Sequence, residues 1–394
     1  MKIAFIVQRY GLDVLGGAEF HCRLIAELLS KHYEVEILTT CAKDYLTWKN
    51  DYEEGDEKIN GLVVKRFKVA KERKPKNFGR FSRRVFKLFH FNRDELKWLE
   101  LQGPYSPSLF NFLERNEESY DLFIFFSYRF WPTYHGIMRF SHKSFLVPTA
   151  EHDDAIYLKI FKPFFNKPKA IIYNSVEEKN LINHVSSNND IFSDIIGVGV
   201  KVPERYNSRE FRNRYNIFDD YVIYVGRIDP NKGCPEMFQC FLQYVKKNPS
   251  RKIKLVLIGK EVIKIPRHKS IIYLGSISSE DKFSAINNSL FMIMPSQYES
   301  LSMVTLEAWF VSKPVLVNGR CEVLKGQCRR SNGGLYYSNY EEFEACMDYM
   351  LQNGSSVKML GKQGNAYAEK NYKWEVIERK YINMIKSFQE NNMT

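Results

Sequence analysis

Two glutamates stand eight residues apart in a mostly apolar stretch of the chain. Glu299 and Glu307 belong to the sequence MPSQYESLSMVTLEAWFVSKP at residues 294–314. On a helix that rises 1.5 Å per residue, this spacing covers roughly 11–12 Å. Two carboxylates so placed can hold hydroxyl groups at two points along one extended ligand, such as the sugar and ribose ends of a single molecule. The alternative is that one glutamate caps a helix and the other faces solvent.

A strand, a loop and a helix are expected around these glutamates. The apolar strand is expected over 290–294, just before a proline. The helix is expected to begin near Leu301, with Ser300 or Ser302 capping its first backbone N–H groups. Glu299 would then lie at the carboxyl end of a parallel strand, where α/β folds bind ligands.

Two cations lie in a second loop, in the sequence GRIDPNKG at residues 226–233. A strand is expected over 221–225 and a helix from about Pro235, so that Arg227 and Lys232 lie beside the helix N-terminus. Fixed cations next to the positive end of a helix dipole make a site for a pyrophosphate, which arginine can bind in a forked manner. The alternative is a loop of ordinary surface charges.

Near the N-terminus, a strand, a glycine-containing loop and a helix begin a predicted β-α-β unit. The first strand is expected over 3–7 and the second over 35–39, with Gly16 and Gly17 at the start of the helix between them. Paired glycines there allow a phosphate or a sugar to approach the backbone N–H groups. The spacing is not G-x-G-x-x-G, which disfavours a dinucleotide site, and a plain tight turn is the alternative.

His152 follows a strand expected over 144–147 and is flanked by Glu151 and Asp153. Loops at the carboxyl ends of strands carry the active sites of doubly wound folds, so these three side chains are candidates for a site. The alternative is that the histidine is a satisfied structural residue.

The order of the elements indicates an α/β protein with two Rossmann-like, doubly wound domains. A chain of 394 residues is long enough for both. We expect an N-terminal domain over 1–203, a C-terminal domain over 204–372 and a final helix over 373–394. No apolar run is long enough to predict a membrane span, and the seven cysteines contain no C-x-x-C pair, which disfavours a disulfide framework or a zinc site. A cytoplasmic protein is expected.

Most of the net charge of +12 comes from residues 65–97, which hold thirteen Lys or Arg and three acids. Five apolar residues recur there at helical spacing between the cations: Phe78, Phe81, Val85, Leu88 and Phe89. A basic amphipathic helix of this kind can lie on an anionic membrane surface. A solvated face is the alternative. Nucleic-acid binding is less favoured, because no motif for it accompanies the charge.

Together these motifs resemble the retaining glycosyltransferases of the GT-B fold, family 4 type, over nearly the whole chain. GRIDPNKG (226–233) resembles the phosphate-binding loop of that family, and YESLSMVTLEA (298–308) resembles its pair of glutamates with seven residues between them. LGGAE (15–19) and EHD (151–153) resemble its N-terminal glycine loop and its histidine-containing acceptor-side segment. In two places, Ser302 and Ser312, a serine stands where the family usually has glycine.

The resemblance implies two domains that face each other across a cleft, with the last helix crossing back to the first domain. It implies that Arg227 and Lys232 bind the donor diphosphate. Glu299 would hold the donor sugar, Glu307 the ribose, and His152 would line the sugar site. The implied catalytic residues are Glu299, His152, Arg227 and Lys232. The implied donor-binding residues are Gly16, Gly17, Gly226, Arg227, Lys232, Glu299, Ser300, Leu301, Ser302 and Glu307, and those on the acceptor side are Glu151 and Asp153.

The implied reaction moves a hexosyl group from a nucleoside-diphosphate sugar to an acceptor hydroxyl with retention of configuration, in surface polysaccharide, lipopolysaccharide or glycolipid assembly. Fixed cations would stabilise the leaving diphosphate, so no metal or other cofactor is expected. The expected partners are the donor, a sugar or lipid-linked glycan acceptor and the inner face of a membrane, reached through residues 65–97. The alternatives are a GT-B enzyme that acts on a free nucleotide sugar, such as an epimerase, and a basic nucleic-acid-binding protein.

Overall fold

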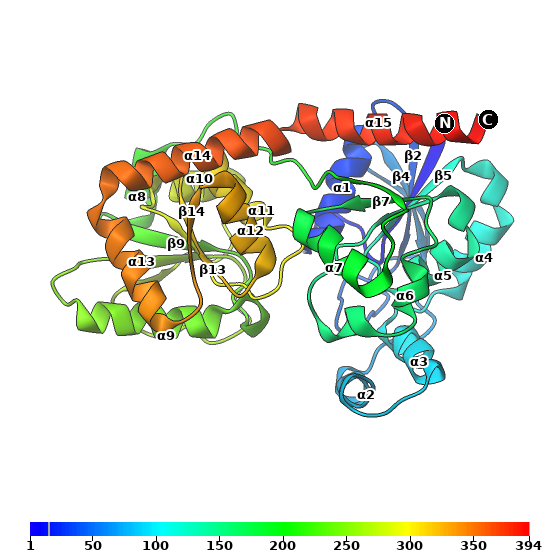
Figure 1. Ribbon diagram of the computed structural model, residues 1–394, viewed down its shortest axis with the longest axis horizontal. Helices are drawn as coiled ribbons and strands as arrows, with labels where there is room; N and C mark the ends of the chain where they lie inside the picture. Colours follow the sequence, from blue (N-terminus) through cyan, green and yellow to red (C-terminus); the bar gives the residue numbers. More distant parts are fainter. Residues whose placement is uncertain (15, 394) are drawn as a thin grey trace. The chain divides into compact units, whose positions relative to one another are not determined.

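The computed structural model describes residues 1–14 and 16–393 and divides into two compact units (Figure 1). The first unit comprises Met1–Val198 and a C-terminal segment that begins at Glu378, and the second comprises Gly199–Ile377. Each unit is built on one sheet with helices packed around it. The predicted fold class, α/β with two Rossmann-like parallel-sheet domains, is confirmed. The division after Val198 lies a few residues before the boundary expected at 203–204.

The sheet of the first unit has eight strands in the order β3-β4-β2-β1-β5-β6-β7-β8. The strands are β1 (Lys2–Ile6), β2 (Glu34–Thr40), β3 (Gly55–Ile59), β4 (Leu62–Phe67), β5 (Leu122–Phe126), β6 (Ser144–Val147), β7 (Ala170–Tyr173) and β8 (Phe192–Ile195). Neighbouring strands are parallel except β3 and β4, which form an antiparallel hairpin. β5, β6 and β7 are buried along their whole length, as expected where helices cover both faces of a parallel sheet.

Seven helices accompany this sheet among the described residues of the first unit, apart from the C-terminal one. They are α1 (Gly17–Leu29), α2 (Pro75–Lys87), α3 (Asn92–Gln102), α4 (Pro107–Arg115), α5 (Trp131–Arg139), α6 (Phe161–Phe164) and α7 (Val176–Ser186). β1 lies between β2 and β5, so the chain winds away from it in both directions. The loop that leaves β1, which carries Gly16, therefore lies at the topological switch point of the sheet, where doubly wound folds bind ligands.

The sheet of the second unit has six strands in the order β11-β10-β9-β12-β13-β14, all parallel. The strands are β9 (Tyr221–Val225), β10 (Lys254–Ile258), β11 (Ile271–Tyr273), β12 (Met292–Met294), β13 (Val315–Asn318) and β14 (Gly334–Tyr337). The helices are α8 (Ser208–Tyr215), α9 (Cys234–Lys247), α10 (Ser279–Asn288), α11 (Met303–Phe310), α12 (Glu322–Ser331), α13 (Tyr340–Gln352) and α14 (Gly354–Tyr372). β9 and β12 are neighbours at the centre, so the two loops that leave them emerge side by side.

The last helix, α15 (Trp374–Met393), returns the chain to the first unit. Phe388 packs edge-on against Phe145 of β6, with 5.2 Å between ring centroids. Lys380 Nζ donates to the carbonyl of Ile195 at 2.7 Å. Tyr381 is fully buried, so an apolar face of α15 belongs to the core of the first unit.

Helix α2 does not present an apolar face to solvent, contrary to the expectation for residues 65–97. Val85 is fully buried, and Phe78 and Phe81 pack against the core of the first unit. The helix ends at Lys87, so Leu88 and Phe89 lie beyond it and are exposed. The predicted helical period is therefore correct up to Val85, but the apolar face is covered by α3 and is not free to lie on a membrane.

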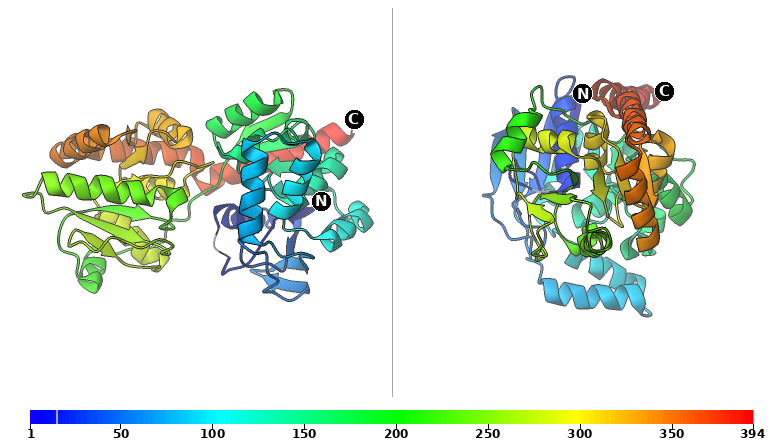
Figure 2. Two further views of the ribbon diagram at one scale, coloured as in Figure 1. Left: turned by 90° about the horizontal axis from the view of Figure 1, so that it is seen from below. Right: turned by 90° about the vertical axis from the view of Figure 1, so that its left-hand side faces the viewer.

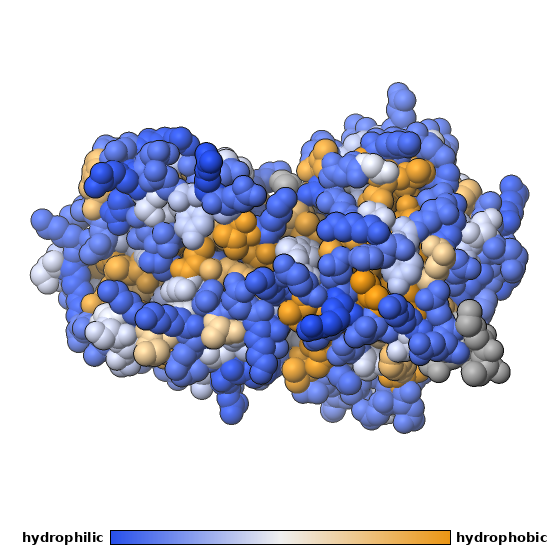
Figure 3. Space-filling model, turned by 90° about the horizontal axis from the view of Figure 1, so that it is seen from above, coloured by the Kyte–Doolittle hydropathy of each residue, from blue (hydrophilic) through white to orange (hydrophobic). Residues whose placement is uncertain are grey.

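None of the helices formed by the described residues is both long and apolar enough to cross a bilayer. Figure 3 shows one face of the molecule, on which hydrophilic side chains predominate and hydrophobic ones appear in small groups between them.

Candidate functional site

The loop that leaves β9 is shaped by its own charged residues. Asp229 caps the short turn Pro230–Lys232, and its carboxylate accepts the backbone N–H of Lys232 at 3.0 Å. The Nε of Arg227 donates to the other oxygen of the same carboxylate. Gly226 has a φ of +148° and Gly233 a φ of +72°, which are backbone angles that residues other than glycine rarely adopt. This loop therefore holds two cations next to the start of α9.

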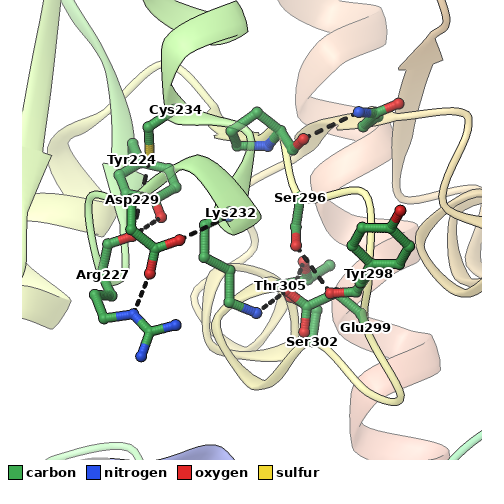
Figure 4. Close-up of polar contacts among 12 residues, drawn as sticks. Tyr224, Arg227, Asp229, Lys232, Cys234, Ser296, Tyr298, Glu299, Ser302 and Thr305 are labelled. Atoms are coloured by element: carbon green, nitrogen blue, oxygen red, sulfur yellow. Dashed lines mark hydrogen bonds and ion pairs between the residues drawn. The ribbon is translucent and has the colours of Figure 1, made fainter. Parts of the chain in front are cut away.

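The two loops predicted to form the site lie in contact. A Cβ atom on Gly233 would come within 2.1 Å of the carbonyl oxygen of Pro295, so only glycine permits this approach of the two backbones. Asn318, at the end of β13, donates to the same carbonyl at 3.0 Å and fixes it from the other side. Lys232 Nζ then reaches Glu299 Oε1 at 2.7 Å across the loops (Figure 4). The structure thus brings Arg227, Lys232 and Glu299 into one group.

The loop before α11 differs in detail from the prediction. The helix starts at Met303 and not near Leu301, with Ser302 at the N-cap position. The hydroxyl of Ser302 accepts a hydrogen bond from the hydroxyl of Thr305 at 2.9 Å and makes no side-chain cap to a backbone N–H. Ser300 and Leu301 are half-buried loop residues. The expected capping bond is therefore wrong, while the expected loop position of Glu299 is correct.

Glu307 lies little more than one turn into α11, where the sequence predicted two. Its Oε1 accepts from Lys282 Nζ of α10 at 2.6 Å. Its other oxygen, Oε2, is buried and has no hydrogen-bond partner among the described residues. A buried oxygen without a partner costs free energy unless a water molecule or a ligand satisfies it, so Glu307 has one acceptor position open. Lys282 was not foreseen, because its pairing with Glu307 depends on how α10 and α11 pack.

The glycines of the first unit serve a buried ion pair. A Cβ on Gly16 would come within 2.0 Å of Glu19 Oε2 and would displace that carboxylate, whereas the Cβ position of Gly17 is open. Glu19 Oε1 accepts from Arg9 Nη2 at 2.5 Å and from Gln8 Nε2 at 2.8 Å. Both charged side chains are only 7% exposed. Arg9 and Glu19 were missed by sequence reasoning. Leu15, the first residue of the LGGAE motif, lies outside the described residues.

Asp153 belongs to the framework of its loop. Its carboxylate accepts backbone N–H groups at the start of the short helix Asp154–Tyr157 and pairs with Arg129 Nη1 at 2.5 Å. His152 is exposed, and its ring packs edge-on against Tyr157 with 5.6 Å between centroids. Glu151 is half-buried in the same loop. Of these three residues, His152 is therefore the one whose side chain is exposed to solvent.

Glu178 was also missed, and it holds the loops that leave β6 and β7. Its two oxygens accept the backbone N–H groups of Ala150 and Asn174, each at 2.5 Å. Complete burial raises the pKa of Glu178 to about 8. The position of the 151–153 segment thus depends on a carboxyl group that lies on α7.

The described residues contain no cluster of three or more His, Cys, Asp or Glu side chains arranged to hold a metal ion. The candidate residues fall into two sets. Gly226, Arg227, Lys232, Glu299, Ser300, Leu301, Ser302 and Glu307 belong to the second unit, and Gly16, Gly17, Glu151, His152 and Asp153 belong to the first.

Comparison with known proteins finds a family match within the second unit. Residues 207–367 match the family model described as "Glycosyl transferases group 1". The chain is 22% identical over 238 residues to the capsular polysaccharide biosynthesis glycosyltransferase CapM of Staphylococcus aureus, which covers 56% of this chain and 60% of that protein. It is 22% identical over 192 residues to an uncharacterized glycosyltransferase of Methanocaldococcus jannaschii, which covers 45% of this chain and 47% of the relative. The chain thus spans less than two thirds of the length of these curated relatives.

Solved structures match the chain along almost its full length. HepE of Anabaena, in complex with UDP and glucose, gives a TM-score of 0.71 at 13% identity and covers 98% of this chain and 100% of that one. Sucrose-phosphate synthase from Thermosynechococcus elongatus gives 0.70 at 15% identity, with 99% of both chains covered. WaaG, a glycosyltransferase involved in lipopolysaccharide biosynthesis, gives 0.63 at 15% identity and covers 96% and 98%. The chain has the GT-B fold, and its residues 207–367 match the model of the glycosyl transferases group 1 family.

Proposed function

We propose that this protein is a retaining glycosyltransferase that moves a hexosyl group from a nucleoside-diphosphate sugar to an acceptor hydroxyl. The observation that carries the proposal is the contact between Lys232 and Glu299, with Arg227 beside them, inside the region that matches the group 1 domain. Two cations and a carboxylate on touching loops suit a ligand that has a diphosphate at one end and hydroxyl groups at the other.

The charges account for the proposed chemistry. Breaking the bond between the sugar and the diphosphate places negative charge on the leaving group. Arg227 and Lys232 would stabilise that charge more in the transition state than in the ground state, and this difference accelerates the reaction. On donor binding, Lys232 would exchange Glu299 for a phosphate oxygen, which releases the glutamate to accept sugar hydroxyls. The acceptor would attack the anomeric carbon from the side of the leaving group.

The open oxygen of Glu307 is the proposed contact for the ribose. A ribose hydroxyl can donate to Oε2, while Lys282 keeps Oε1 occupied and holds the carboxylate in place. The donor site would then extend from the turn at Lys232 to the second turn of α11. His152, Glu151 and Asp153, with Gly16 and Gly17, are proposed to serve the sugar and acceptor ends.

Uridine is the proposed base, because HepE is described with UDP and with UDP-glucose bound. CapM is named for capsular polysaccharide biosynthesis and WaaG for lipopolysaccharide biosynthesis, which supports a role in surface polysaccharide or glycolipid assembly. The inner face of the membrane is the proposed place of this work. Because two protein cations face the diphosphate, the reaction is proposed to need no metal. Activity that falls strongly on addition of EDTA would contradict this point.

A thermal-shift screen against UDP, GDP, ADP and TDP tests the donor site. A nucleotide that binds only the folded protein raises the melting temperature of the protein. At a nucleotide concentration of 100 times the dissociation constant, the free energy of unfolding increases by about 2.7 kcal/mol. We expect one of the four nucleotides to raise the melting temperature of the native protein at micromolar concentration. The same nucleotide should not raise the melting temperature of the Glu307→Ala variant. If none of them shifts the transition, the proposed donor site is wrong.

Release of nucleoside diphosphate, measured with and without a glycan acceptor, separates a transferase from an enzyme that acts on the free nucleotide sugar. A transferase releases the diphosphate much faster when the acceptor is present. An epimerase-like enzyme changes the sugar nucleotide at the same rate in both mixtures.

A further inference from the structure

The turn between α2 and α3, residues 88–91, lies at the edge of the first unit (Figure 2). Three of its four residues expose large hydrophobic side chains. Leu88 is 63% exposed, Phe89 85% and Phe91 55%. The aromatic residues of α2 are half-buried and pack against the core, and Phe78 and Phe86 contact Trp98 of α3 with ring centroids 6.1 and 5.5 Å apart. Leu88, Phe89 and Phe91 are therefore not part of the hydrophobic core of the first unit.

The turn is held in this form by hydrogen bonds. The ring nitrogens of His90 lie 2.7 Å from Glu95 Oε1 and 3.0 Å from the carbonyl of Leu88. Glu95 is fully buried, and its other oxygen accepts the backbone N–H of Ile160 at 2.9 Å. Phe89 packs edge-on against Phe91 at 5.1 Å. The turn is thus tied to the body of the unit while its hydrophobic side chains point outward.

Cations surround the exposed side chains. Arg80, Arg83 and Lys87 share the outward face of α2, because they are three and four residues apart along the helix. Arg93 lies in the first turn of α3, and Lys159 lies on a neighbouring loop. These five residues are exposed and form no ion pair with any residue that the structure describes. An open depression of about 520 Å³ lies at the turn, lined by Phe89, His90, Phe91, Asn92, Arg93 and Lys159.

We propose that this turn, with Arg93 and Lys159, docks the protein on an anionic phospholipid bilayer. Phe89 and Leu88 would enter the boundary between headgroups and acyl chains, where exposed aromatic and aliphatic side chains are stabilised. Arg93 and Lys159 would hold a lipid phosphate in the depression between them, and the outward face of α2 would lie along the negative surface. The membrane contact is therefore assigned to the tip of the α2–α3 hairpin and not to the apolar face of α2.

The aromatic pair does not suit single-stranded nucleic acid, the other polyanion that a basic surface could bind. Bases stack on the open faces of aromatic rings. The guanidinium of Arg93 lies 5.3 Å from the centre of the Phe91 ring, and Phe89 meets Phe91 at an interplanar angle of 82°. These neighbours leave no flat platform of two parallel rings for consecutive bases.

Flotation with lipid vesicles tests this proposal without the sugar donor, so its failure would leave the proposed transferase activity untouched. The probes are vesicles of phosphatidylglycerol with phosphatidylcholine and vesicles of phosphatidylcholine alone. We expect the full chain to float with the anionic vesicles. The double variant Phe89→Ser/Phe91→Ser should bind them about tenfold more weakly, because two exposed rings are removed from the bilayer boundary. Arg93→Glu/Lys159→Glu should lose about as much.

Matched controls make the result specific to the turn. Phe218 is an aromatic residue of the second unit that is 66% exposed, and Lys252 is an exposed lysine of the same unit. Phe218→Ser and Lys252→Glu should bind vesicles as the native protein does, and all variants should keep the native melting temperature. The proposal is overturned if the native chain does not float, if it floats equally with neutral vesicles, or if the controls lose as much binding as the turn variants.

Discussion

In the second unit the charged side chains of the candidate motifs pair with one another, whereas in the first unit they pair with the framework. Lys232 and Glu299 bridge two loops, and Arg227 remains 40% exposed. Glu19 is buried against Arg9, and Asp153 caps a helix. Lys232 is 30% exposed, so it can leave Glu299 for a ligand at a lower cost than the buried Arg9 can leave Glu19. Glu19 and Asp153 therefore support their loops, whereas Lys232 and Glu299 are the pair that we propose binds the donor.

The largest expected effect is on transfer in the second unit. Lys232→Ala should lower the rate of transfer by about 10²–10³-fold, because it removes a cation from the leaving diphosphate. Its melting temperature should change little, since the lysine is partly exposed. Lys246→Ala, on the exposed side of α9, is the control and should keep the native rate. Native activity in Lys232→Ala would remove this residue from the site and with it the contrast between the units.

The next effect concerns stability in the first unit. Glu19→Ala leaves the buried Arg9 without its partner and should lower the free energy of unfolding by about 3–5 kcal/mol. Glu299→Ala, the corresponding change in the second unit, should cost less, because the lysine left behind is 30% exposed and can be solvated. Calorimetry of both variants measures the difference. Equal losses in the two would show that both pairs are structural.

The stability of the first unit should also depend on pH, through a buried histidine. Burial lowers the pKa of His21, in α1, to about 3. The unfolded histidine takes up a proton below about pH 6.5 while the folded one stays neutral, so stability falls as the pH decreases from 6.5 towards 3. The loss from this residue should reach about 2 kcal/mol at pH 5. Unfolding curves at pH 5 and 7.5 should differ less for His21→Gln, and an unchanged difference would contradict the assignment. His268→Gln, at an exposed position, is the control.

The smallest effect tests a departure from the usual family sequence. Ser312 has a φ of +56°, in the left-handed region that favours glycine. Ser312→Gly should therefore stabilise the second unit by about 0.5–1 kcal/mol, since relief of this strain outweighs the entropy that glycine adds to the unfolded chain. Ser250→Gly, at a residue outside that region, should destabilise it slightly. A lower melting temperature for Ser312→Gly would mean that its side chain is needed there.

The elements around the motifs could be predicted because each is defined by local signals. Apolar runs ended by Pro or Gly located β9 and β12, and the predicted bounds differ from the observed ones by at most two residues. The β3–β4 hairpin was missed, although Asn60 and Gly61 at its turn both have positive φ and form a strong local signal. The sequence therefore contains enough local information to predict this hairpin.

The pairs that shape the sites depend on packing and could not be predicted in the same way. Lys282 and Glu307 are on different helices, and Arg9 and Glu19 meet from opposite ends of the loop that leaves β1, with Gly16 leaving room for the Glu19 carboxylate. The helical period of Phe78, Phe81 and Val85 shows that one face of α2 is apolar, but it does not show whether a membrane or Trp98 covers that face.

By itself, the sequence determined the α/β class, the positions of the two loops in the second unit and the charges that these loops carry. Only the tertiary structure decided that Gly233 and Pro295 bring those loops into contact, which charged residues are buried as supports, and that Leu88 and Phe89 lie at a turn and not on a helix face. The physical reason is that backbone preferences and periodicity act over a few neighbouring residues. Which charges pair and which apolar faces pack together depends on residues that are far apart in the sequence.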